Sequence, residues 1–192
     1  MGHYFIEDEN LEHNVISHDA VINGTKFTFF TDNGVFSKKG LDFGTRSLLE
    51  NLPVLTGDVL DFGCGYGPIG IYINKTYNVS VDMIDINVRS INLAKRNASN
   101  NQANVNIFLS NIYENVEKKY DYIVTNPPIR VGKEILYKII FGAKEYLKEG
   151  GQLWLVVSKD QGAKSLLKDL QKDYDAKLIC KNKGFYIICA SK

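Results

Sequence analysis

The stretch VLDFGCGYGPIG, Val59 to Gly70, decides the predicted fold. It begins as a short apolar run of the kind that forms a buried strand. It ends where Pro68 suits the first turn of a helix, because the missing N–H of proline has no helical partner there anyway. Between the two lie Gly63, Gly65 and Gly67, which tolerate positive φ and let the backbone approach a ligand closely. The pattern predicts a strand, a glycine-rich turn and a helix that together form a ligand site.

The same alternation of strands and helices continues along the chain. Short apolar runs bounded by Gly, Asn, Asp or Pro predict strands at 59–63, 79–86, 105–110, 120–126 and 151–158. Helical patterns are predicted at 68–77, at 87–101, from Lys133 to a stop at Gly150–Gly151, and at 159–174. Because the strands are apolar on both faces and helices separate them, we predict a parallel, doubly wound α/β sheet. Near the end, runs 176–182 and 185–191 flank Lys183–Gly184 and predict an antiparallel hairpin.

The first part of the chain departs from this alternation. A small antiparallel hairpin is predicted around Asn23–Gly24, followed by a glycine-rich connector and by a short helix from Arg46 that stops before Pro53. We therefore expect residues 1–44 to form an N-terminal β-hairpin extension packed on a core domain of residues 45–192.

Composition narrows the classes of function. The 192-residue chain is 44% hydrophobic and carries a formal net charge of +1, so overall charge argues neither for nor against a nucleic-acid partner. The sequence has no membrane-spanning run and no export signal, which predicts a cytoplasmic protein without a membrane partner. Its three cysteines, odd in number and without ligand spacing, are expected to be reduced. Since His3, His13 and His18 all precede the predicted core, we expect neither a metal site nor a histidine-assisted nucleophile.

Two acids accompany the glycine-rich turn. Asp61 stands directly before it, where a carboxylate suits the ammonium of an amino-acid group and not a phosphate. Asp85 ends the next strand, the position from which an acid accepts hydrogen bonds from ribose hydroxyls. The spacing G-x-G-x-G also departs from the fingerprint of NAD-binding proteins. These features predict a nucleoside with an amino-acid tail. Asn111, at the end of the third strand, is placed either to meet an adenine amino group or to cap a loop.

A second motif follows the fourth predicted strand. In TNPP, Thr125 to Pro128, the prolines stop the sheet and hold their carbonyl groups in fixed directions. The side-chain oxygen of Asn126 and the carbonyl of Pro127 can accept the two hydrogens of an exocyclic amine. Such acceptors orient the nitrogen lone pair and stabilise the charge that develops when the amine attacks a methyl group. The motif therefore predicts methyl transfer to an exocyclic nitrogen.

At this point the chain resembles a known family. DFGCGYG, Asp85 and NPPI together resemble the Rossmann-like S-adenosylmethionine-dependent methyltransferases that modify exocyclic nitrogens. The segments TDNGVFSKKGLDFGTRSLLE and NPPIRVGKE resemble, more narrowly, the small-subunit (16S) ribosomal RNA guanine-N2 methyltransferases. The resemblance implies a seven-stranded, mostly parallel sheet with an antiparallel C-terminal strand, S-adenosyl-L-methionine as cofactor, and ribosomal RNA or the small ribosomal subunit as partner.

The resemblance also implies roles for individual residues. It implies that the cofactor is bound by Asp61, Gly63, Cys64, Gly65, Asp85, Ile86, Asn111, Ile112 and Asn126. It implies that the catalytic residues, which bind the target amine, are Asn126, Pro127, Pro128 and Ile129. On the substrate side, Phe36 lines the site together with Ser37 and Asp42, and Arg130 contacts an RNA phosphate or a base edge.

The sequence departs from the family pattern in three respects. Ile129 stands where many relatives have Tyr or Phe, so Phe36 is the candidate for stacking on a flipped base. Asn111 stands where many relatives have Asp. The bacterial two-domain form of the family has an additional N-terminal domain without a counterpart in this sequence. We therefore expect RNA positioning to depend on the N-terminal hairpin and on Lys38, Lys39, Lys164, Lys168 and Lys172.

The predicted reaction is direct methyl transfer to guanine N2 in small-subunit ribosomal RNA, with no covalent enzyme intermediate. Three alternatives stay open: methylation of a glutamine side chain in a protein, a non-catalytic cofactor-binding module for ribosome assembly, and a nicotinamide-dependent oxidoreductase. The last requires a G-x-G-x-x-G turn, which the sequence lacks. The sequence leaves the oligomeric state, monomer or homodimer, open.

Overall fold

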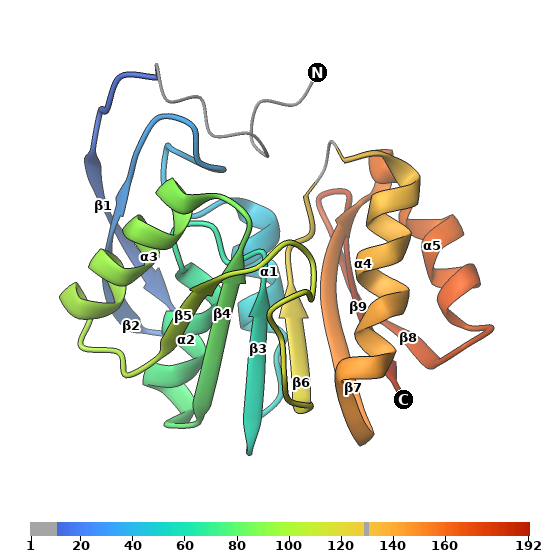
Figure 1. Ribbon diagram of the computed structural model, residues 1–192. Helices are drawn as coiled ribbons and strands as arrows, with labels where there is room; N and C mark the ends of the chain where they lie inside the picture. Colours follow the sequence, from blue (N-terminus) through green and yellow to red (C-terminus); the bar gives the residue numbers. More distant parts are fainter. Residues whose placement is uncertain (1–10, 129–130) are drawn as a thin grey trace.

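The computed structural model describes residues 11–128 and 131–192 (Figure 1). Its main sheet has seven strands in the order β5-β4-β3-β6-β7-β9-β8. The strands are β3 (Asp58–Phe62), β4 (Ser80–Asp85), β5 (Asn106–Leu109), β6 (Tyr120–Thr125), β7 (Leu147–Ser158), β8 (Asp175–Asn182) and β9 (Phe185–Ser191). Strands β3 to β7 pair in parallel, whereas β9 is antiparallel to both β7 and β8. This confirms the predicted Rossmann-like, mostly parallel sheet with its antiparallel C-terminal hairpin.

Helices cover both faces of the main sheet. They are α1 (Phe43–Glu50), α2 (Pro68–Tyr77), α3 (Val88–Asn100), α4 (Gly132–Tyr146) and α5 (Ala163–Leu170), with a short 3-10 turn η1 (Lys159–Gln161) before α5. Successive strand residues point to opposite faces. Val59 is therefore buried with side chains of α1, α2 and α3, whereas Leu60 is buried with side chains of α4 and α5. Two apolar layers enclose the sheet, as the continuous apolar runs predict.

The order of the strands determines where a binding crevice opens in the sheet. From β3 the chain proceeds through β4 to β5 on one side, and then crosses to β6 on the other side of β3. The two connections leave β3 and β6 in opposite directions, which opens a crevice at the carboxyl ends of these strands. Both predicted motifs, the glycine-rich turn after β3 and Asn-Pro-Pro after β6, lie at this point.

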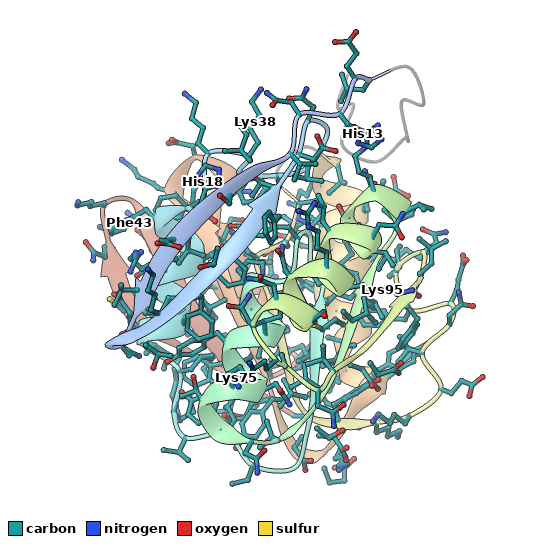
Figure 2. All side chains as sticks on the ribbon, turned by 90° about the vertical axis from the view of Figure 1, so that its left-hand side faces the viewer. His13, His18, Lys38, Phe43, Lys75 and Lys95 are labelled. Atoms are coloured by element: carbon teal, nitrogen blue, oxygen red, sulfur yellow. The ribbon has the colours of Figure 1, made fainter. Side chains whose placement is uncertain are left out.

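A separate two-stranded sheet precedes the main domain. It consists of β1 (Ile16–Ile22) and β2 (Thr25–Thr31), which pair antiparallel around Asn23–Gly24, and it confirms the predicted hairpin. Figure 2 shows it lying across α3. The side chain of Asn97 in α3 accepts from the backbone N–H of Phe30 at 2.7 Å and donates to its carbonyl at 2.9 Å. A side chain that satisfies both backbone groups of one residue fixes the hairpin against the helix.

Three predicted helices have wrong boundaries. The helix predicted at 159–174 is the 3-10 turn η1 followed, after Gly162 at φ +79°, by α5, which ends at Leu170. Helix α4 ends at Tyr146, and β7 already begins at Leu147 and contains Gly150–Gly151. Gly150 has φ +75°, and a Cβ on Gly151 would lie 2.9 Å from the carbonyl oxygen of Lys148. The two glycines therefore form the irregularity where the β6–β7 register shifts, and they do not cap a helix. The first helix begins at Phe43 and not at Arg46, because Asp42 accepts from the Thr45 N–H as an N-cap.

Two further findings concern membrane-spanning helices and cysteines. Within the described ranges, no helix combines the length and the apolar character that crossing a membrane requires. Cys64, Cys180 and Cys189 are free thiols, as predicted.

Candidate active site

A pocket of about 600 Å³ opens at the carboxyl ends of β3, β4, β5 and β6. It gathers most of the predicted site residues, namely Phe36, Gly63, Cys64, Gly65, Asp85, Ile86, Asn111, Ile112, Asn126, Pro127 and Pro128. Asp61 lies beneath the pocket and not in its wall. The predicted roles of Ile129 and Arg130 fall outside the described residues.

The glycine-rich turn forms the floor of the pocket. Gly63 and Gly65 have φ values of +68° and +56°, and a Cβ built on either would meet no protein atom within 4 Å. Packing therefore does not require glycine at these two positions, but their positive φ favours it. The space above the backbone is open to a ligand. The Cys64 N–H donates to the carbonyl of Ile84 at 2.8 Å, which ties the turn to β4. The turn presents bare backbone over which a ligand can lie.

Asp85 joins this turn to the end of β4. One carboxylate oxygen accepts from the Gly65 N–H at 2.8 Å, and the other accepts from the Asn87 N–H at 2.8 Å. Burial raises the pKa of the Asp85 carboxyl, and these backbone donors act in the opposite direction. Each oxygen keeps a further lone pair after these bonds. The carboxylate is thus oriented, with acceptor capacity left for a ligand hydroxyl group.

Asp61 is fully buried behind the turn. Its Oδ2 accepts from the Gly70 N–H at 2.8 Å in the first turn of α2, whereas Oδ1 has no hydrogen-bond partner in the described structure. Burial, with a smaller contribution from the charge of Asp85, raises the pKa of Asp61 to about 8. A buried, unpaired carboxylate oxygen is costly unless a cation or donor meets it. Direct contact between Asp61 and an ammonium group stays a prediction.

The loop after β5 closes another wall. The Asn111 amide donates to Oε1 of Glu114 at 2.8 Å, so its side chain is held within the loop. Ile112 has φ +52°, a left-handed conformation that a β-branched residue rarely adopts. The Ser110 hydroxyl donates to the carbonyl of Ile112 at 3.1 Å and holds this conformation. Backbone strain of this kind concentrates at ligand sites, and here it lies in the pocket wall.

Asn126 is oriented from the opposite side of the pocket. Its Nδ2 donates to Oγ1 of Thr45 at 2.9 Å. Because the amide nitrogen is engaged by the protein, the amide oxygen is the atom left to accept from a ligand. Pro127 and Pro128 line the same pocket directly after Asn126. The arrangement is suited to accept hydrogens from an amine placed beside the cofactor site.

The segment Asp42-Phe43-Gly44-Thr45 explains how Thr45 reaches Asn126. Asp42 caps α1, and a Cβ on Gly44 would lie 2.9 Å from the ring of Phe185 on β9. The missing side chain at Gly44 therefore lets α1 approach the sheet closely. Thr45 is a contributor that the sequence reasoning missed. The available signal was its place in this segment, which resembles the family.

Phe36 forms the outer edge of the site. Its side chain lines the pocket and is 42% exposed, which leaves a ring available to a substrate. The connector that carries it is held at the carbonyl of Lys38, which accepts from the hydroxyl of Thr31 at 2.7 Å and lies 3.0 Å from Nε2 of His18. The ring is therefore presented by a fixed backbone.

The site fits a nucleoside with a charged amino-acid tail. The open glycine floor, the oriented Asp85 and the unpaired Asp61 oxygen supply backbone approach, ribose acceptors and a nearby acid. Among the described residues, no three His, Cys, Asp or Glu side chains lie close enough to hold a metal ion. Fold and site together define the class, a Rossmann-like S-adenosylmethionine-dependent methyltransferase.

The chain belongs to the methyltransferase small domain family, whose model matches residues 26–189. This confirms the resemblance of the sequence to S-adenosylmethionine-dependent methyltransferases, and with it the class of enzyme and the cofactor.

Individual relatives extend the comparison. The chain is 40% identical to a Bacillus subtilis (strain 168) protein named "Uncharacterized protein YbxB", over 99% of this chain and 98% of that one. It is 38% identical to the ribosomal RNA small subunit methyltransferase C of Psychromonas ingrahamii, over 76% of this chain and 44% of that protein. Thus it spans about half the length of the methyltransferases of that name.

A solved structure shares the fold. The chain matches a T. thermophilus 16S rRNA N2 G1207 methyltransferase, solved with AdoMet and guanosine, with a TM-score of 0.83 and 24% identity. The match covers 93% of this chain and 50% of that one.

Proposed function

We propose that this protein transfers a methyl group from S-adenosylmethionine to the exocyclic N2 of a guanine in small-subunit ribosomal RNA. The observation that carries the proposal is the pocket itself, in which Asn126, Pro127 and Pro128 share one cavity with the glycine floor and Asp85. An amine acceptor and a nucleoside site in one cavity are what N-methylation needs. The names of the relatives, which specify a ribosomal RNA small subunit methyltransferase, support RNA as the acceptor.

The residues of this chain have distinct parts in the reaction. When bound, the cofactor supplies an electrophilic methyl group on a sulfonium sulfur. Asp85 and the glycine turn would hold the nucleoside part of the cofactor in the pocket that Asn126 also lines. The Asn126 oxygen and the Pro127 carbonyl accept the two amine hydrogens and direct the nitrogen lone pair at the methyl carbon. The amine nitrogen would bond to the methyl carbon as that carbon leaves the sulfonium sulfur, which would become a neutral thioether. The amine would then lose a proton to water.

The neutral acceptors explain why no strong base is needed. The positive charge that appears on the nitrogen during attack is stabilised by the two carbonyl-type oxygens, and it disappears with the departing proton. The site would act on ribosomal RNA in the cytoplasm.

Transfer of tritiated methyl groups tests the proposal. Naked small-subunit RNA, partly assembled subunits and total protein extract are offered as acceptors. Label in RNA that digests to N2-methylguanosine is the expected result. Label only in protein would favour glutamine methylation, and no label despite bound cofactor would favour a non-catalytic module.

A further inference from the structure

Exposed lysines surround the pocket, and we propose that they hold the phosphates of an RNA strand on both sides of the nucleotide that enters the pocket. The proposal rests on the proposed function and names the surface that would bind its substrate. The lysines concerned, here called the rim lysines, are Lys38, Lys39, Lys133, Lys138, Lys181 and Lys183. None forms an ion pair within residues 11–128 and 131–192.

The first side of the rim is the connector between β2 and α1. Lys38 and Lys39 are exposed there, between the pocket residues Phe36 and Asp42. The nearest polar partner of the Lys38 ammonium is the amide oxygen of Asn33 at 3.4 Å, which does not neutralise its charge. Figure 2 shows Lys38 at one end of the face that β1 and β2 cover. Two cations thus stand beside the exposed ring of Phe36.

The second side is formed by α4 and by the tip of the β8–β9 hairpin. Lys138 lines the pocket itself, next to the acid Glu134, and the Lys133 ammonium lies 4.8 Å from the ring centroid of Tyr137. At the hairpin tip, the Lys183 ammonium lies 4.8 Å from the ring centroid of Phe43, the residue that follows Asp42. A ring attracts a cation without cancelling its net charge. Lys133 and Lys183 are therefore positioned by rings, as is Lys181 near the same hairpin tip, whose ammonium lies 5.4 Å from the ring centroid of Tyr186. All three remain available to an anion.

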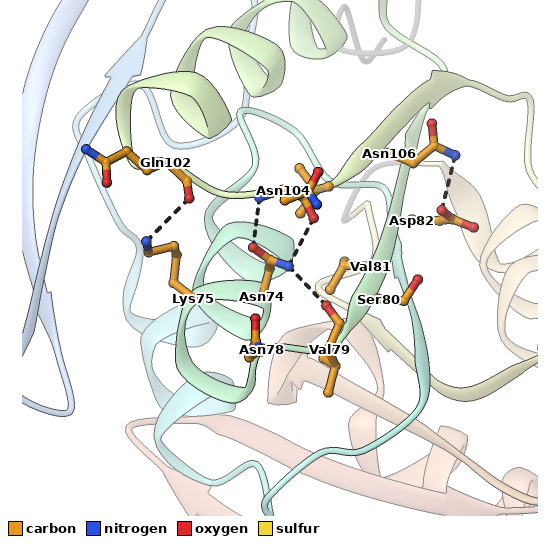
Figure 3. Close-up of a pocket in the computed structure, with 11 residues that line it drawn as sticks. Asn74, Lys75, Asn78, Val79, Ser80, Val81, Asp82, Gln102, Asn104 and Asn106 are labelled. Carbon is orange, nitrogen blue, oxygen red and sulfur yellow. Dashed lines mark hydrogen bonds between the residues drawn. The ribbon is translucent and has the colours of Figure 1, made fainter.

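Two lysines at the opposite edge of the sheet are paired with acids. At the amino ends of the strands, the Lys148 ammonium lies 2.9 Å from Asp58 and 2.8 Å from Asp121, and the Lys118 ammonium lies 3.1 Å from Asp82. A polar hollow of about 580 Å³ near this edge is lined by amide side chains such as Asn74, which bond to neighbouring groups (Figure 3). Lys118 and Lys148 are therefore paired at this edge, whereas Lys75, which lines the hollow, donates to the carbonyl of Gln102 at 3.3 Å and pairs with no acid among the described residues.

The neighbourhood favours RNA over an acidic protein. Phe36 presents a ring at the pocket, with its side chain 42% exposed, and cations flank the pocket from separate elements. Recognition of a single strand combines such a stacking ring with a line of positive charge along the backbone. Lysines act as point charges on phosphates without reading sequence. In this arrangement the target base enters the pocket, and the phosphates before and after it contact opposite sides of the rim.

Salt-dependent binding tests the surface without any methyl transfer. The probe is a fluorescein-labelled RNA hairpin with an unpaired guanine in its loop, titrated without cofactor at several salt concentrations. The variants K38Q/K39Q and K181Q/K183Q each remove two cations from one side of the rim. K75Q/K95Q is the matched control, because both lysines are exposed and neither lines the pocket.

Each rim variant is expected to raise Kd about tenfold and to reduce the slope of log K against log salt by about 0.7 per lost phosphate contact. The control should keep the wild-type slope, and thermal melting should show that all variants fold. Wild-type slopes in both rim variants, an equal loss in the control, or no binding by the wild type would each overturn the surface. RNA binding that depends on the rim without methyl transfer would overturn the proposed function alone, and methyl transfer with unaffected binding would overturn the surface alone.

Discussion

The side-chain amide of Asn126 donates to the hydroxyl oxygen of Thr45 at 2.9 Å, across 81 positions of sequence. The bond connects the first turn of α1 to the segment that follows β6, on either side of the pocket. It determines which atom of the amide faces a substrate, because the nitrogen is already engaged. Thr45 is thus a positioning residue, which acts on the proposed reaction through Asn126.

Replacement of Thr45 tests this relationship. Thr45→Val keeps the shape but removes the acceptor, so the amide of Asn126 is free to rotate. We expect kcat for methyl transfer to fall about tenfold, the cost of one hydrogen bond, while the affinity for S-adenosylmethionine stays at the wild-type value. Thr45→Ser retains the hydroxyl group and should restore most of the rate. A similar loss in the Ser and Val variants would mean that Thr45 matters for packing and not for its hydroxyl.

Replacement of Asn126 itself should reduce turnover more than replacement of Thr45. Asn126→Ala removes one of the two acceptors for the amine, and we expect turnover to fall by about a hundredfold or more. Cofactor binding, measured by calorimetry, should change little, because the glycine floor and Asp85 remain. Turnover equal to that of the wild type would exclude Asn126 as an acceptor of the target amine.

Replacement of Asp85 should weaken the binding of S-adenosylmethionine. In Asp85→Ala, the acceptors for the ribose hydroxyls and for the Gly65 N–H disappear together. Hydrogen bonds to a charged group contribute about 1.5–3 kcal/mol, so we expect the affinity for S-adenosylmethionine to fall by about tenfold to a hundredfold. Calorimetric titration gives this value directly. The same Kd in variant and wild type would remove Asp85 from the cofactor site.

The sequence predicted the elements whose signals are local. The apolar run at Val59, the glycines after it and the two prolines after Asn126 carry their own backbone preferences, and the structure places them as predicted. The alternation of strands and helices also predicted the parallel sheet and the edge at which both motifs meet.

Features that depend on contacts between distant segments were not predicted. Thr45 looks like an ordinary helical residue until the fold brings it to Asn126, and Gly150 looks like a helix stop until β7 requires a bulge. Likewise, nothing in the sequence shows that the carboxylate of Asp61 turns inward to Gly70 and leaves one oxygen unpaired. Such outcomes depend on tertiary packing, which local patterns do not encode.

The buried carboxyl of Asp61 should make stability depend on pH. In the unfolded chain this group titrates near its ordinary pKa of 3.8, whereas burial raises its pKa to about 8 in the folded protein. Between these values the folded state holds a proton that the unfolded state has released, so the free energy of unfolding falls as pH rises. Asp61→Asn has no such proton and keeps an oxygen that can accept from Gly70. Its Tm should exceed that of the wild type by a margin that grows from about pH 5 to about pH 8.

Asp58 offers a control, because its effect on the free energy of unfolding should change with pH in the opposite direction. Its hydrogen bond to Lys148 lowers the pKa of its carboxyl, so this group stabilises the fold above its ordinary pKa and loses that effect as pH falls. Asp58→Asn should therefore lose stability relative to the wild type near neutral pH and approach it in acid. Thermal melts followed by circular dichroism across this range compare the two variants under identical conditions. A constant difference in Tm between Asp61→Asn and the wild type at every pH would show that the carboxyl of Asp61 has the same pKa in the folded and unfolded chain, because only a shifted pKa makes that difference depend on pH.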